Sequence, residues 1–156
     1  MISINIPGFR KLELAYLVAD YNGTLAVDGY LLPGVAEQLN NLASSLSIYV
    51  VTADTFGLAK AELAGLPINL TIAPLESQAD MKLEFISRLG SSAVVAIGNG
   101  RNDRKMLEAA GLGIALIQRE CAATETILSA DIVSNSIIDA LELLNNPKRL
   151  IATLRS

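Results

Sequence analysis

The chain has 156 residues, a formal net charge of −4 at neutral pH and no histidine. This length suits one domain with a buried core, and a negative charge without clustered basic residues argues against nucleic-acid binding. The lack of histidine, together with a single cysteine, excludes serine–histidine and cysteine–histidine catalysis and most zinc sites. Any chemistry must therefore use carboxylates, lysine, hydroxyl groups or backbone amides.

Composition also bears on compartment and assembly. The single cysteine, Cys121, cannot form an internal disulfide, so we expect a reducing, cytoplasmic location. No apolar run approaches the ~20 residues that span a bilayer, and the N-terminal residues lack a signal-peptide pattern, so we expect no membrane partner. Hydrophobic residues make up 51% of the chain even without glycine. This excess over ordinary soluble proteins predicts that apolar surface is buried between subunits.

Strand-like and helix-like segments alternate along the chain. Apolar runs indicate buried strands at Leu14–Ala19, Ser47–Val51, Asn69–Ile72 and Ala93–Ile97. Helical patterns occupy Gly34–Leu46, Leu58–Leu66, Ala79–Leu89 and Lys105–Ala110. The alternation continues through Leu112–Ile117, Ala122–Leu128, Asp131–Val133 and Ile137–Leu144. We therefore predict a single α/β domain over residues 1–156, with a mainly parallel sheet between two helical layers.

Polar residues follow three of the predicted strands, where ligands bind in such sheets. They are Asp20-Tyr21-Asn22-Gly23-Thr24, then Thr52, then Gly98-Asn99-Gly100-Arg101-Asn102-Asp103, with Lys82 on the helix before the last strand. Each feature alone has a simpler explanation. An Asn-Gly pair makes a hairpin turn, a threonine caps a helix, and a lone lysine is usually solvated.

In this order, however, the features resemble the four signatures of the haloacid dehalogenase superfamily of phosphotransferases. These are an Asp-x-Asp-Gly-Thr nucleophile loop, a Thr or Ser after the next strand, a lysine, and a Gly-Asp-Gly-x-Asn-Asp loop. The resemblance covers Leu14 to Leu116 and is strongest to the phosphorylation domain of P-type ATPases. It implies a Rossmann-like fold and a Mg²⁺-dependent phosphatase or phosphotransferase that forms an aspartyl-phosphate on Asp20.

The resemblance also implies a role for each matching residue. The catalytic residues would be Asp20, Asn22, Thr52 and Lys82. The phosphate would be bound by Asn22, Gly23, Thr52, Ala53, Lys82 and Asn102. The Mg²⁺ ligands would be Asp20, Asn22 (through its backbone carbonyl), Asn99 and Asp103.

Two positions depart from the superfamily pattern, because Asn22 and Asn99 stand where aspartate is usual. Asn22 replaces the residue that protonates the leaving group and activates water, and an amide cannot move a proton in this way. Asn99 replaces a charged Mg²⁺ ligand with a neutral one. We expect slow turnover; the alternative is a non-catalytic module that binds a phosphorylated ligand or a protein partner.

The spacing of the signatures leaves no room for the cap domain that many members insert. What remains is Leu25–Leu32, with a turn at Asp28-Gly29, which predicts a β-hairpin flap beside the nucleophile. Capless members of the superfamily act on large substrates or use a neighbouring subunit as a lid. We therefore expect a homo-oligomer, a dimer or a tetramer, that assembles through the flap.

Overall fold

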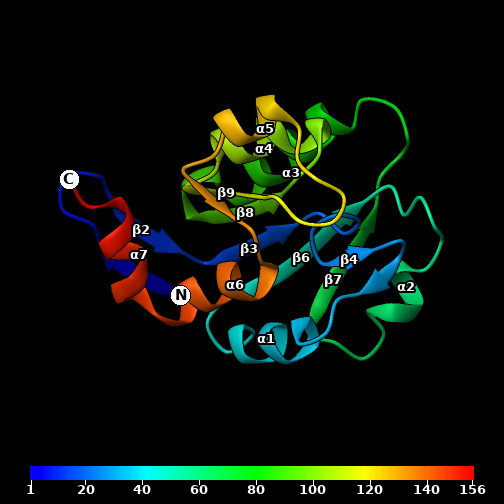
Figure 1. Cartoon of the computed structure of the whole chain (residues 1–156), viewed down its shortest axis with the longest axis horizontal. Coiled ribbons are helices and arrows are strands. Elements are labelled where there is room, and N and C mark those ends of the chain that lie inside the picture. The colour runs from blue at the N-terminus through cyan, green and yellow to red at the C-terminus, as the bar shows by residue number, and fades with distance from the viewer.

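A six-stranded parallel sheet forms the centre of the structure, a computed structural model that describes residues 1–156 (Figure 1). The strands lie in the order β10-β9-β8-β3-β6-β7, and every neighbouring pair is parallel. Their bounds are β3 (Tyr16–Ala19), β6 (Ser47–Thr52), β7 (Ile68–Ile72), β8 (Val94–Gly98), β9 (Leu112–Leu116) and β10 (Ile132–Ser134). The predicted α/β class and parallel sheet are confirmed.

Helices cover both faces of this sheet, as Figure 1 shows. One face carries α3 (Gln78–Leu89), α4 (Arg104–Ala109) and α5 (Thr124–Leu128). The other carries α1 (Val35–Leu42), α2 (Ala59–Glu62) and α6 (Ile137–Asn145), with α7 (Pro147–Leu154) beyond them. Every residue of β8 and β9 is buried, because each strand has apolar neighbours on both faces. This explains why those strands are continuous apolar runs.

Three sequence-based boundaries need correction, the first being the helix predicted over Gly34–Leu46, which ends at Leu42. The run Leu14–Ala19 is not one strand, because Leu14 ends β2 (Lys11–Leu14), which pairs antiparallel with β1 (Ile2–Asn5). Buried leucines alternate with exposed charged residues in β2, so only one face of this hairpin packs against the core. The helix predicted to extend to Leu66 ends at Glu62. No helix has the length and apolar character needed to cross a membrane.

The predicted flap is a hairpin of β4 (Ala26–Val27) and β5 (Tyr30–Leu31). Its turn residues, Asp28 and Gly29, have φ of 52° and 85°, the left-handed pair that a tight two-residue hairpin requires. The Tyr21 hydroxyl donates to the carbonyl of Gly29 at 2.9 Å and ties the flap to the segment after β3. No cap domain is inserted on either side of the flap.

Candidate active site

The central strands bring the predicted signatures together at one edge of the sheet. In the register, Ala19 of β3 faces Val50 of β6 on one side and Ile97 of β8 on the other. The residues that follow these strands therefore meet around Asp20. The chain leaves β3 toward β6 and later returns to its other side through β8, so the site lies at a topological switch point.

A polar pocket of about 240 Å³ opens there. Six predicted site residues line it: Asp20, Asn22, Thr52, Ala53, Asn99 and Asn102. Four further residues complete the wall, which are Thr55, Gln78, Gly100 and Glu120. Three predicted residues do not reach it. Gly23 lines a neighbouring cavity instead, whereas Lys82 and Asp103 lie fully buried behind the pocket.

Lys82 joins the two carboxylates of the site. Its Nζ lies 2.7 Å from Oδ1 of Asp20 and 2.6 Å from Oδ1 of Asp103. Helix α3 places this lysine on its buried side, where it has no solvent exposure. Burial by itself lowers the pKa of Lys82, but the negative charges of Asp20 and Asp103 outweigh it and raise the pKa. The ammonium therefore stays protonated.

Asp103 organises the loop after β8. Its Oδ2 accepts hydrogen bonds from the backbone N–H groups of Asn99 at 3.0 Å and Gly100 at 2.9 Å. Gly98 permits this approach, because a Cβ at that position would lie 2.5 Å from Asp103 Cγ. Since Lys82 binds the other oxygen, both oxygens of Asp103 are engaged within the protein. In the structure Asp103 positions Lys82 and the loop after β8, and its role as a Mg²⁺ ligand stays a prediction.

Asp20 differs from Asp103 because it reaches the pocket with 7% of its surface exposed. Burial raises its pKa to about 6, and the nearby Asp103 charge adds to the effect, while Lys82 opposes it. The bond to Lys82 uses Oδ1. The carboxylate is thus held in one orientation at the floor of the pocket.

Asn22 and Asn99 offer neutral oxygen atoms to the same pocket. The Asn22 backbone carbonyl accepts no hydrogen bond within the chain, while its side-chain Oδ1 accepts from the N–H of Gly29 at 3.1 Å. The Asn99 Nδ2 donates to the Cys121 carbonyl at 3.0 Å, and its Oδ1 accepts from the Thr24 hydroxyl at 3.3 Å, which together fix the orientation of this amide. A second lone pair on Oδ1 remains for a cation. No three His, Cys, Asp or Glu side chains cluster to hold a metal ion. One carboxylate plus neutral oxygens still suits a hard cation such as Mg²⁺.

The end of β6 offers hydrogen-bond donors. Thr52 is buried, and its Oγ1 accepts from the N–H of Asp54 at 3.0 Å. This leaves the hydroxyl proton of Thr52 for a ligand in the pocket. The neighbouring N–H of Ala53 donates no hydrogen bond within the chain. Both groups are therefore available to an anionic oxygen.

Glu120 and Gln118 were missed by the sequence reasoning. Both lie on residues 117–123, the segment that follows β9 (the yellow loop in Figure 1). Gln118 Nε2 donates to the Thr24 carbonyl at 3.0 Å, and its Oε1 accepts from the N–H of Ile137 at 2.9 Å. The sequence does contain a signal for them, because the polar run Gln118-Arg119-Glu120 closely follows the buried strand β9. Gln118 and Glu120 follow β9 at the same edge of the sheet at which Asn99 follows β8.

Comparisons with known proteins agree with this arrangement. Residues 82–139 match the family described as haloacid dehalogenase-like hydrolase. An uncharacterised protein of Methanocaldococcus jannaschii is 55% identical over 62 residues, which make up 40% of this chain and 67% of that protein.

Solved structures of the superfamily share the fold over nearly the whole chain. A proposed subfamily IIIA hydrolase from Legionella pneumophila superposes with a TM-score of 0.72 at 16% identity, covering 91% of this chain and 87% of that one. A 3-deoxy-D-manno-octulosonate 8-phosphate phosphatase from Moraxella catarrhalis, solved in complex with a magnesium ion, a phosphate ion and a KDO molecule, gives a TM-score of 0.66 at 21% identity, covering 92% of this chain and 94% of that one. The matched family, the shared fold and the four signatures around Asp20 lead to one assignment: the chain belongs to the haloacid dehalogenase superfamily.

Proposed function

We propose that the protein is a phosphatase or phosphotransferase that works through an aspartyl-phosphate on Asp20. The observation that carries this proposal is the position of Lys82, which bridges Asp20 and Asp103 behind a polar pocket at the switch point of the sheet. Burying a lysine carries a desolvation penalty that pairing with carboxylates can fail to repay, so a role for its charge in the site would explain the arrangement. Here it holds the nucleophile and offsets negative charge where a phosphate would enter.

Different residues of the pocket would have different roles in phosphoryl transfer. Asp20 would attack phosphorus through a carboxylate oxygen while the bond to the leaving group breaks and that group departs with the electron pair. The Thr52 hydroxyl and the Ala53 N–H would donate to the equatorial oxygens, where charge is concentrated during transfer. Asn102 lies on the same wall, with its Nδ2 donating to Oε1 of Gln78 at 2.6 Å.

Mg²⁺ is the cation that this donor set fits. The Asp20 carboxylate, the Asn22 backbone carbonyl and the Asn99 amide oxygen would hold it, while Asp103 shapes the loop from behind. Bound there, Mg²⁺ would neutralise charge on the phosphate oxygens. Because one expected carboxylate ligand is an amide, we expect weaker Mg²⁺ binding in the absence of phosphate than a full aspartate set would give.

A second candidate function follows from the same asparagines. Without a carboxyl group at position 22, the fold could bind a phosphorylated ligand or a protein partner and never turn it over. The ion pair on Lys82 favours the enzyme, since a binding module has no need of a restrained nucleophile. The two functions can be distinguished, because the enzyme would form covalent phosphate on Asp20 and the binding module would not.

The first experiment is a screen of phosphomonoesters with and without Mg²⁺, comparing wild type with Asp20→Asn. The matched control is Asp139→Asn, an equally small change at an exposed residue on α6. We expect Mg²⁺-dependent release of phosphate by wild type and the control, and none by Asp20→Asn. Equal activity in all three proteins would place the chemistry elsewhere and contradict the proposal.

A further inference from the structure

We propose that Glu120 is the general base that activates water for hydrolysis of phospho-Asp20, in place of the carboxyl group that position 22 lacks. This inference rests on the proposed function. It begins with the position of Glu120, which is the one residue shared by two adjoining cavities. One is the polar pocket of about 240 Å³ around Asp20. The other, of about 530 Å³, lies between the flap and the start of α6.

The two cavities suit two parts of a phosphomonoester. The smaller has the nucleophile and the free donors, and so suits the phosphoryl group. The larger is lined partly by apolar residues of the flap and α6, Val27, Leu32 and Ile138 among them, and so suits a leaving group. The bond that breaks would then lie near their junction, beside Glu120. Water would enter from the same side once the leaving group departs.

No other group on the pocket wall can serve as this base. The wall has only two carboxylates, Asp20 and Glu120, and Asp20 would itself carry the phosphoryl group. The remaining side chains on the wall are amides, hydroxyls and a methyl group, none of which accepts a proton readily at neutral pH. Asp103 is buried behind the wall and bound on both oxygens. Glu120 is therefore the remaining carboxylate with access to the pocket.

The loop that carries Glu120 is held in place from two directions. Gln118 binds the carbonyls of Gly23 and Thr24 in the nucleophile loop, and Glu120 Oε1 accepts a long hydrogen bond of 3.4 Å from the N–H of Asp28 in the flap. The carboxylate is thus tethered beside the pocket but still exposed to solvent. Exposure allows it to return a proton to bulk water between turnovers.

The chemical step balances without any further reactant. The water oxygen forms a bond to phosphorus while the bond between phosphorus and the Asp20 oxygen breaks, and that electron pair returns to the Asp20 carboxylate. The proton lost by the water goes to Glu120, which then releases it to solvent. The products are inorganic phosphate and free Asp20.

Glu120→Gln tests this role, because glutamine keeps the oxygen that accepts from Asp28 but cannot take a proton. The probe is p-nitrophenyl phosphate, whose good leaving group needs no protonation, so that phosphorylation and hydrolysis can be separated. We expect an unchanged burst of nitrophenol, a steady-state rate lower by about 10–100-fold, and accumulation of acid-trapped phosphoenzyme. Glu37→Gln, at an exposed position on α1, is the matched control and should behave as wild type.

The double variant Asn22→Asp/Glu120→Gln separates a proton-transfer role from a structural one. If Glu120 acts as the base, an aspartate at position 22 should substitute for it, and Glu120→Gln should cost less than about threefold in that background. Unchanged steady-state turnover in Glu120→Gln, or an equal loss of burst and turnover, would overturn the inference while leaving an active, Asp20-dependent enzyme. A wild type that forms no phosphoenzyme would instead overturn the proposed function, and this inference with it.

Discussion

Lys82 and Asp103 form an ion pair of 2.6 Å in which neither side chain has any solvent exposure. The pair lies directly behind Asp20, which Lys82 also binds. Two carboxylates and one ammonium give this group a net charge of −1. A Mg²⁺ ion and a phosphate would therefore enter a site whose charge is already partly balanced. The same arrangement makes Lys82 a structural residue as well as a functional one.

Lys82→Met should lower the free energy of unfolding by about 3–5 kcal/mol. The substitution leaves Asp20 and Asp103 close together with no cation between them, and an uncompensated buried charge is strongly destabilising. Urea denaturation measures the change. Lys60→Met, at an exposed position on α2, should change stability by less than about 0.5 kcal/mol. Equal stability of the two variants would show that the buried pair contributes little.

Asn22→Asp should raise steady-state turnover of an aryl phosphate by about 10–100-fold, because it restores a proton acceptor in the nucleophile loop. The gain should fall short of a full general-base effect, since neighbouring groups are arranged around an amide. The added charge should also tighten Mg²⁺ binding. Asn40→Asp on the exposed surface of α1 adds the same charge elsewhere and should leave turnover unchanged. An Asn22→Asp variant no faster than wild type, with no acid-trapped phosphoenzyme in either protein, would argue for the binding module.

Tyr21 should make the fold sensitive to alkaline pH. Burial raises its pKa to about 12 from its ordinary value of 10.0, and the charges of Glu62 and Asp54 add to the effect. Because the folded state holds the phenol proton more tightly than the unfolded state, this contribution to stability is complete below pH 10 and is lost between pH 10 and 12. Urea midpoints of wild type and Tyr21→Phe, measured from pH 9 upward, should therefore converge or cross. Parallel curves would contradict the expectation.

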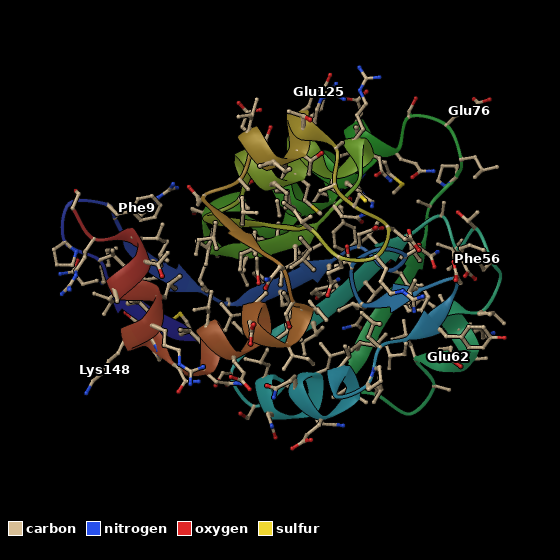
Figure 2. The ribbon with its side chains drawn as sticks, in the orientation of Figure 1. Phe9, Phe56, Glu62, Glu76, Glu125 and Lys148 are labelled. Atoms are coloured by element: carbon tan, nitrogen blue, oxygen red, sulfur yellow. The ribbon has the colours of Figure 1, made fainter.

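Self-association through the flap remains a proposal. The structure shows which flap residues are exposed enough to form a subunit interface. Leu25, which the sequence suggested for this interface, is fully buried in the chain's own core. Tyr30 remains 60% exposed. Phe56, labelled in Figure 2, is 49% exposed and lies next to Gly29 in the flap, because a Cβ added to Gly29 would come within 2.7 Å of Phe56 Cβ. Light scattering should report a dimer or tetramer for wild type and a smaller species for Tyr30→Ser/Phe56→Ser. A wild-type monomer at micromolar concentration would contradict the proposal.

The strands were predictable because both faces of the sheet are covered, so that β6, β8 and their neighbours stand out as continuous apolar runs. The residues after those strands were predictable for the same reason, since parallel strands end together. The hairpin of β1 and β2 was not, because it packs one face only and its pattern alternates over very few residues.

How deeply each site residue is buried could not be predicted from the sequence. Lys82 lies on an amphipathic helix, where most lysines are solvated, and only the packing of α3 against the loop after β8 buries it. Asp103 could equally have faced the pocket; its hydrogen bonds to Asn99 and Gly100 turn it inward. Glu120 comes from a part of the chain outside the four signatures and reaches the site only through the fold.

Covalent phosphate on Asp20 is the most direct test of the account. Wild type and Asp20→Asn should each be mixed with a phosphorus-32-labelled phosphodonor and Mg²⁺, quenched in acid, and digested so that the labelled peptide can be identified. We expect label on the wild-type peptide that contains Asp20, removable by hydroxylamine as an acyl phosphate should be, and no label on Asp20→Asn. Phosphate release by wild type with no label on Asp20, or label retained in the Asp20→Asn protein, would contradict the account.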